Sequence, residues 1–341
     1  MSKAITTPSI SVVIACYNGA PWLPDTFGHI VTALNNAHIR DAEIIVVNDG
    51  STDGSSEVAH AAQLAYPVVV VDQPNEGRFI ARRQGVRAAK YDYVFFVDTR
   101  VHIGANALAF VASQVREHPD RRIWNGHVYV AKEGNIIARF MDAVTFIGWR
   151  RYFAHPKTTS YGLKDFDYYP KGTGCFFVPK EQLLAAMAEF ESTTTDLKFS
   201  SDDTLLIRFL ARDSRINLSP QFDCRYFART TARGFIKHTY HRGQFFVDGF
   251  LRPGTRFFWP LIGVLVGSVV GLVVLVGLAV VAPAWLLLLL ALGVTVWLGE
   301  LLVALALKVP AKDALSLWWL SPAFTLLYLA GIWRGTLRKL G

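Results

Sequence analysis

Cysteine is scarce in this sequence, and the few cysteines follow no binding pattern. Cys16, Cys175 and Cys224 are the three cysteines of the 341-residue chain. They form no Cys-x-x-Cys pair, which excludes a zinc ribbon and a thioredoxin-type redox motif. Their odd number, and the lack of an apolar core in the first ten residues, indicate a reducing compartment without a secretory signal peptide.

Charge is nearly missing from the last quarter of the chain. From residue 257 onward the charged residues are Glu300, Lys308, Lys312, Asp313, Arg334, Arg338 and Lys339. The apolar stretches 260–282 and 284–307 are each long enough to cross a bilayer as a helix. A third apolar stretch, 315–333, is interrupted by Pro322. We therefore expect a multi-pass protein of the cell membrane.

The third stretch decides on which side the basic C-terminus lies. Three full spans would place the C-terminal arginines opposite the N-terminal domain, against the positive-inside tendency. We therefore favour two spans and a third segment that re-enters or lies in the membrane interface. In the first span, Gly263, Gly267 and Gly271 recur every four residues, a pattern typical of close helix packing, so this helix is the expected contact of an oligomer.

The rest of the chain alternates between apolar runs and stretches of helical character. Polar loops follow each run, and such alternation predicts an α/β fold whose sheet has helices on both faces. The runs are 11–15, 43–47, 68–71 and 93–97, with further strands expected at 123–130 and 171–179. Since ligands bind at the carboxyl ends of such strands, the polar loops should converge on one site.

A basic segment joins the two parts. Residues 225–256 contain seven Lys or Arg and one acid, Asp248. Arg229, Arg233, Lys237 and His241 recur every four residues and so share one helix face. A basic, partly aromatic helix of this kind indicates contact with anionic lipids, the alternative being an ordinary solvated face. Without a nucleic-acid motif beside the charge, we expect no nucleic-acid partner.

These patterns predict three regions. Residues 1–225 should form a cytoplasmic α/β domain, residues 226–258 a basic amphipathic segment at the membrane, and residues 259–341 the membrane domain.

Four motifs in order carry a resemblance to a known family. They are SVVIACYNGAPWL, EIIVVNDGSTDGS, NEGRFIARRQG and VFFVDTR, followed later by SDDTLLIRFL and HTYHRG. In this order they resemble the family 2 glycosyltransferases, with the resemblance covering roughly residues 9–243. It implies the GT-A fold, a Rossmann-like mixed sheet with helices on both faces.

The resemblance implies a nucleotide-sugar site at the loops. Tyr17 would stack on the base, and Asp49 would accept the N–H of a uracil, although both also suit an ordinary turn. Arg82 would touch the nucleotide or its diphosphate, whereas Arg78 and Arg83 are expected at the surface or behind the site. The further expected donor-binding residues are Asn18, Gly50, Asn75, Gly77, Asp98, Gly172, Thr173 and Gly174.

The acids of the SDDT motif are the catalytic candidates. By resemblance, Asp203 is the general base that takes the proton of the acceptor hydroxyl. Asp202 is its catalytic companion, or an acid that stabilises a helix N-terminus. Arg242 would neutralise the leaving diphosphate or the acceptor phosphate. Arg229, Arg233, Lys237, His238 and His241 are the candidates for binding acceptor or lipid.

The VDTR motif departs from the family pattern. Metal-using members carry Asp-x-Asp, but here Arg100 follows Asp98 at the second acidic position. His102 falls where a third ligand is expected, and imidazole is a competent ligand, so Asp98 and His102 are the candidate site for Mg²⁺ or Mn²⁺. Alternatively, Arg100 replaces the metal with a permanent positive charge beside the diphosphate.

The resulting prediction is an inverting glycosyltransferase. Its partners would be a nucleotide-sugar donor, a polyprenyl-(di)phosphate-linked acceptor and membrane lipids, in cell-envelope or extracellular polysaccharide synthesis. One alternative is a polyprenyl-phosphate monosaccharide transferase that makes a lipid-linked sugar donor. Another is a nucleotide-sugar-binding pseudoenzyme or scaffold, which the unusual Arg100 motivates.

Overall fold

The computed structural model describes residues 8–192 and 197–340, and the chain divides into two compact units. The first unit comprises Met1–Ala131 and Arg151–Ala228, and the second comprises Lys132–Arg150 and Arg229–Gly341. The sequence pattern showed no sign that the segment Lys132–Arg150 belongs with the C-terminal part.

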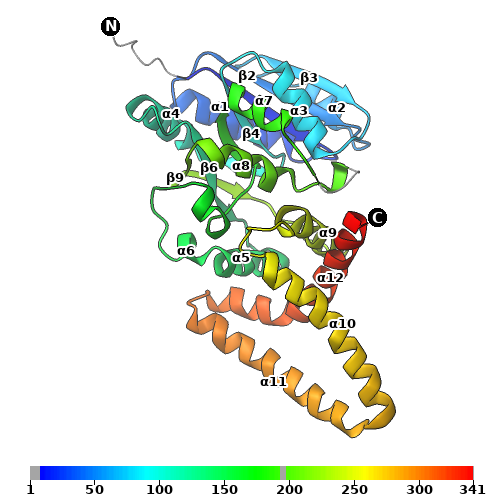
Figure 1. Ribbon diagram of the computed structural model, residues 1–341. Helices are drawn as coiled ribbons and strands as arrows, with labels where there is room; N and C mark the ends of the chain where they lie inside the picture. The colour runs from blue at the N-terminus through cyan, green and yellow to red at the C-terminus, as the bar shows by residue number, and fades with distance from the viewer. Residues whose placement is uncertain (1–7, 193–196, 341) are drawn as a thin grey trace. The chain divides into compact units, whose positions relative to one another are not determined.

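A mixed β-sheet forms the centre of the first unit (Figure 1). Within the described residues its order is β3-β2-β1-β4-β8-β6-β9-β5, with β7 paired to β9. The strands are β1 (Ile10–Cys16), β2 (Ala42–Asp49), β3 (Val68–Gln73), β4 (Tyr93–Val97), β5 (Val101–Ile103), β6 (Ile123–Val130), β7 (Thr159–Tyr161), β8 (Cys175–Pro179) and β9 (Ile216–Tyr226). Strands β1 to β4 pair in parallel, and β8 pairs antiparallel to β4. The predicted mixed α/β sheet is confirmed.

Helices cover both faces of this sheet. They are α1 (Leu23–Asn36), α2 (Ser55–His60), α3 (Arg78–Ala88), α4 (Ala107–Glu117), α6 (Arg150–Phe153), α7 (Lys180–Ala188) and α8 (Asp202–Asp213), with 3-10 turns η1 (Leu163–Tyr168) and η2 (Leu197–Phe199). One buried core includes Phe27 of α1 and Val111 of α4, and the other includes Phe79 of α3 and Leu206 of α8. Every residue of β2 is buried, as expected of a strand covered on both sides.

The second unit is helical. It consists of α5 (Ile136–Gly148), α9 (Ala232–Phe250), α10 (Phe258–Val281), α11 (Ala284–Ala306) and α12 (Ala311–Leu340). In the described residues α10, α11 and α12 are long and apolar enough to cross a membrane, by length and composition. The first two match the two stretches predicted from hydropathy.

Helix α12 continues through Pro322, where the sequence suggested a break. Proline has no N–H, so the carbonyl of Trp318 one turn earlier loses its usual helical partner. That carbonyl accepts instead from Nε1 of Trp297 on α11 at 2.8 Å and from Oγ of Ser321 at 3.2 Å. The two indole rings stack at 4.5 Å. A contact from another helix therefore satisfies the group that the proline leaves free.

Glycines bring α9 and α12 into backbone contact. A Cβ at Gly243 of α9 would lie 2.3 Å from the carbonyl oxygen of Tyr328, and one at Gly331 of α12 would lie 2.1 Å from that of Tyr240. Neither position tolerates a side chain without separating the helices. By contrast, Gly263, Gly267 and Gly271 of α10 meet no described atom within 4 Å outside their own helix.

Candidate active site

Two loops at the carboxyl end of the sheet brace each other. The N–H of Asn18 donates to Oγ of Ser51 at 3.0 Å, and the N–H of Thr52 donates back to Oδ1 of Asn18 at 2.8 Å. Asn18 has a φ of 51°, a left-handed conformation that asparagine tolerates. Tyr17 lies beside it with 55% of its surface exposed. The predicted base-stacking tyrosine is therefore held on a rigid loop with its ring accessible.

Asp49 organises the next pair of loops. Its Oδ1 accepts from the N–H of Glu76 at 2.8 Å, and its Oδ2 accepts from the N–H of Gly77 at 2.9 Å. Asn75 donates from Nδ2 to the Asp49 carbonyl at 3.0 Å. Only 3% of Asp49 is exposed. This geometry favours loop bracing for Asp49 over the predicted contact with a uracil.

The Asn75–Gly77 loop depends on close backbone approach. Gly50 has a φ of +69°, and a Cβ there would lie 2.6 Å from the backbone nitrogen of Asn75. Gly77 has a φ of +93° and lies against Lys198, whose Cγ would be 2.8 Å from an added Cβ. Both glycines are thus required by conformation and by space.

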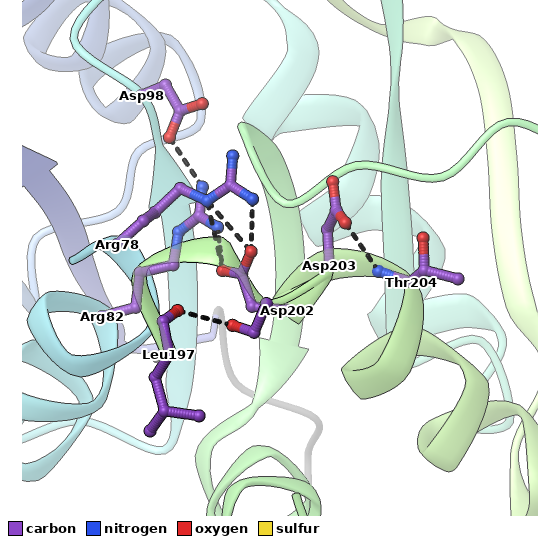
Figure 2. Close-up of polar contacts among 8 residues, drawn as sticks. Arg78, Arg82, Asp98, Leu197, Asp202, Asp203 and Thr204 are labelled. Atoms are coloured by element: carbon purple, nitrogen blue, oxygen red, sulfur yellow. Dashed lines mark hydrogen bonds and ion pairs between the residues drawn. The ribbon is translucent and has the colours of Figure 1, made fainter. Parts of the chain in front are cut away.

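Four charged side chains form a connected network beside these loops (Figure 2). Arg82 donates from Nη1 to Oδ2 of Asp202 at 2.7 Å and from Nη2 to Oδ1 of Asp98 at 2.7 Å. Arg78 donates from Nε to Oδ1 of Asp202 at 3.0 Å and also pairs with it through Nη2. The network joins α3, the end of β4 and the start of α8.

The network determines the charge of its members. Burial would raise the pKa of Asp202, but the adjacent Arg78 and Arg82 outweigh it and lower that pKa. Desolvation of the part of Arg78 that is buried would lower its pKa, but the charges of Asp202, Asp203 and Asp98 raise it. Asp202 is 1% exposed and carries ion pairs on both oxygens. This favours the helix-terminal, ion-pairing role for Asp202 over the catalytic one.

Asp203 is placed differently, although it is the next residue. It is half-buried, and its Oδ1 accepts from the N–H of Thr204 at 2.8 Å. Figure 2 marks a bond from its carboxylate to Thr204 and none to the arginines that hold Asp202. Among the described residues, Oδ2 of Asp203 has no hydrogen-bond partner. One oxygen therefore orients the carboxylate, and the other remains available to accept a proton.

A glycine-rich turn before β8 lies against Asp98. The N–H of Asp98 donates to the Gly174 carbonyl at 3.0 Å, and a Cβ at Gly174 would lie 2.8 Å from Oδ2 of Asp98. Gly172 exchanges hydrogen bonds with the Asn125 side chain at 3.3 and 3.2 Å. Thr173 is 2% exposed, and its hydroxyl has no partner among the described residues. Of the predicted residues of this turn, Gly174 lies beside Asp98 and Gly172 beside Asn125.

Asp98 and His102, the predicted metal pair, each have other contacts in the structure. The His102 ring stacks on His29 of α1 at 4.4 Å and lies 4.6 Å from the ring of Phe227. It lines a cavity of about 590 Å³ between α1, β5 and β9. Asp98 instead pairs with Arg82, and no group of three or more His, Cys, Asp or Glu in the described part of the chain could hold a metal ion. These contacts do not favour a metal held by Asp98 and His102, and a Mg²⁺ or Mn²⁺ ion there stays a prediction.

Arg100, the alternative source of positive charge beside the diphosphate, lies against a tryptophan. Its guanidinium carbon lies 4.7 Å from the centre of the Trp22 ring, at the start of α1. In the described part of the chain, Asp98 and Asp202 form their ion pairs with Arg78 and Arg82 of α3. Arg78 was expected at the surface or behind the site, and the structure places it in the network. Its four-residue spacing from Arg82 was the signal, because that spacing puts both on one helix face.

The remaining predicted residues belong to the second unit. Arg229, Arg233 and Lys237 are exposed at or near the start of α9. Burial and the charges of Lys237, Arg338 and Arg229 lower the pKa of His241. Arg242 lies against the sulfur of Met141 on α5, with Nη1 at 3.8 Å from it. Roles for these residues and for His238 at acceptor or lipid remain predictions.

Comparison with known proteins agrees with this fold. The mixed sheet with helices on both faces and polar loops at the strand ends is the GT-A fold. Residues 11–99 match the family described as Glycosyl transferase family 2, which confirms the resemblance indicated by the motifs. The match covers the first part of the α/β unit, from β1 to the end of β4.

Curated relatives include the poly-beta-1,6-N-acetyl-D-glucosamine synthases of Staphylococcus aureus and Staphylococcus epidermidis. They are 26% and 25% identical to this chain over 131 residues, which is 38% of this chain and 31% of theirs. The chain therefore aligns with about a third of the length of these relatives.

Solved structures show the same fold. The mannosyltransferase PcManGT from Pyrobaculum calidifontis, in complex with GDP-Man and Mn²⁺, has a TM-score of 0.56 at 16% identity and covers 92% of this chain and 88% of its own. Residues 1–349 of S. aureus TarS give a TM-score of 0.50 at 15% identity, covering 70% of this chain and 66% of that one.

Proposed function

We propose that this protein is an inverting glycosyltransferase. It moves a sugar from a nucleotide-sugar donor to a polyprenyl-(di)phosphate-linked acceptor at the cytoplasmic face of the membrane. The observation that carries the proposal is the arrangement of Asp203, which is oriented by Thr204 and has one available oxygen in the first turn of α8. The names of the curated relatives, which are polysaccharide synthases, support the same reaction class.

The residues of the first unit have distinct tasks in this reaction. The donor base stacks on Tyr17, over the loops braced by Asn18 and Asp49. Asp203 takes the proton of an acceptor hydroxyl while the oxygen of that hydroxyl attacks the anomeric carbon of the donor sugar. The bond from that carbon to the diphosphate oxygen breaks, and the nucleoside diphosphate leaves with the electron pair. Attack from the face opposite the leaving group inverts the anomeric centre.

Charge on the leaving diphosphate needs a positive partner. The solved PcManGT structure is a complex with GDP-Man and Mn²⁺, whereas in this protein Asp98 pairs with Arg82 and His102 stacks on His29. The mechanism therefore includes no metal step, and the arginines beside Asp98 supply the positive charge. Donor binding that survives chelation with EDTA is the expected result.

The second unit supports presentation of a lipid-linked acceptor. Helix α12 lies alongside α9, since Gly243 touches the Tyr328 backbone and Arg338 donates to the Gln244 side chain at 2.8 Å. Helix α9 carries Arg233, Lys237 and Arg242, which are costly to place in the hydrocarbon core. A helix held along α9 therefore lies with it at the interface. This supports two spans, α10 and α11, and an α12 that does not cross.

Transfer by membranes containing the protein tests the proposal. Membranes are supplied with a panel of radiolabelled UDP- and GDP-sugars, and the lipid extract is separated and identified. Label in a polyprenyl-linked saccharide is expected from the wild-type protein and not from Asp203→Asn. A product with a single sugar on polyprenyl phosphate would favour the monosaccharide transferase instead. Donor binding without any transfer would favour the pseudoenzyme.

A further inference from the structure

We propose that Arg78, rather than Arg82, is the guanidinium that binds the diphosphate of the donor, and that Asp202 is the positioning residue that holds Arg78 for this task. The proposal rests on the proposed function and names the residue that meets the donor's charge. It differs from the resemblance, which assigns that contact to Arg82.

Accessibility separates the two arginines. The side chain of Arg82 is 2% exposed and lies between two carboxylates, with Nη1 on Asp202 and Nη2 on Asp98. Arg82 thus offers a ligand little access, and breaking its ion pair with the buried Asp202 would be strongly unfavourable. The side chain of Arg78 is 42% exposed while its partner Asp202 is 1% exposed. Arg78 therefore spans from the buried network to solvent.

The hydrogen-bond donors of Arg78 are only partly used. A guanidinium has five N–H donors in a planar fork. Arg78 contacts Asp202 through Nε and Nη2, and its Nη1 has no hydrogen-bond partner among the described residues. The contact with Asp202 thus occupies one edge of the plane and leaves Nη1 for another oxyanion. A planar fork of this kind suits two phosphate oxygens.

Asp202 is held independently of Arg78. Arg82 donates to its Oδ2 at 2.7 Å, and its backbone begins α8. The carboxylate is therefore a fixed point against which the long Arg78 side chain is oriented. Orienting the guanidinium before the ligand arrives reduces the conformational entropy that binding would otherwise cost. Asp202 acts on the donor through Arg78 and without touching it.

The backbone around Arg78 suits the same ligand. Arg78 is the first residue of α3, an 11-residue helix whose N-cap, Gly77, provides no side-chain hydrogen bond. The N–H groups of Glu76 and Gly77 are already bound to Asp49, whereas those of the first helical turn are not capped by a side chain. Uncapped N–H groups at a helix N-terminus favour a phosphate oxygen. The guanidinium of Arg78 and the N–H groups of this helix end therefore belong to the same helical turn, and both can donate to the diphosphate.

Calorimetric titration of the full-length protein in nanodiscs tests the proposal. The probes are UDP and GDP, and the one that the wild type binds is used for the variants. Arg78→Ala should weaken diphosphate binding roughly 10- to 100-fold, as expected for lost hydrogen bonds to a charged group. The affinity of Arg78→Lys should lie between those of the wild type and Arg78→Ala, since lysine keeps the charge but not the planar fork of donors. Arg87→Ala, an exposed arginine of the same helix, is the matched control and should bind as the wild type does.

Asp202→Asn tests the positioning role. Because the carboxylate acts through Arg78, this change should raise the KM for the donor and leave kcat near the wild-type value. In the Arg78→Ala background it should weaken diphosphate binding no further, the non-additivity expected of coupled residues. Melting curves identify any variant that does not fold. If Arg78→Ala does not fold, diphosphate binding by Arg78→Lys tests the role of Arg78.

The possible outcomes separate this inference from the proposed function. A wild-type protein that binds neither nucleoside diphosphate contradicts both. Wild-type binding combined with unchanged binding by folded Arg78→Ala overturns the role of Arg78 and leaves the proposed transfer reaction standing. A loss equally large in Arg87→Ala also overturns it, because a general loss of positive charge would then explain the effect.

Discussion

The adjacent acids Asp202 and Asp203 allow a sharp test of the catalytic assignment. Asp203→Asn keeps the shape of the side chain and the Oδ1 that accepts from the Thr204 N–H at 2.8 Å. It removes the negative charge and the proton-accepting oxygen. A positioned general base contributes about 10²- to 10⁴-fold to rate, so the transfer rate should fall by that factor. Stability should change by no more than about 1 kcal/mol, the value of an acid in a first helical turn.

Asp202→Asn should lower the stability of the protein more than the rate of transfer. It removes one partner from a buried network in which Arg78 and Arg82 both bind Asp202. Breaking such a network costs about 3–5 kcal/mol, and we expect the lower end because Arg78 is partly exposed. For a unit of this size that corresponds to a melting temperature lower by roughly 6–12 °C. The residual transfer should reflect a raised KM for the donor.

The assay compares both variants with the wild type in nanodiscs. Initial rates of label transfer at saturating donor report on catalysis, and thermal melting followed by circular dichroism reports on stability. Sugar transfer by Asp203→Asn at the wild-type rate would refute the catalytic role of Asp203. Wild-type stability of Asp202→Asn would show that the network does not hold the start of α8.

Three further predictions concern charge, packing and metal. The folded-state pKa of Asp202 is lowered, so its ion pairs stabilise the protein above the unfolded-state pKa of about 4. This stability is lost as the pH falls through the folded-state pKa. In Asp202→Asn the melting temperature should therefore fall less steeply at acid pH than in the wild type. Gly243→Val should destabilise the protein by separating α9 from α12, whereas Gly263→Val, which meets no described atom within 4 Å, should melt as the wild type does. EDTA should leave nucleoside diphosphate affinity unchanged within about twofold, and a larger loss in calorimetry would show that a metal carries the charge assigned to arginine.

The donor-side loops were largely predictable from sequence. Tyr17 and Asp98 follow apolar runs directly, so their placement at strand ends depends on local pattern alone. The role of Arg78 was missed because charge on a helix surface is common, and only its contact with a distant acid, Asp202, gives it meaning. The inclusion of Lys132–Arg150 in the second unit was missed for the same reason, because its Lys132 and Arg139 pair with Asp313 far along the chain.

The sequence by itself determined the alternation of strands and helices, the converging polar loops and the apolar C-terminal helices. These features follow from hydrophobic period and turn chemistry, which act over a few residues. Tertiary structure alone decided which of two adjacent acids is neutralised and which is available, since that depends on arginines more than 100 positions away in the chain. It likewise placed the His102 ring against His29 of α1, a contact that no local pattern indicates. Contacts between distant parts of the chain thus distinguish the roles of site residues whose positions in the sequence look alike.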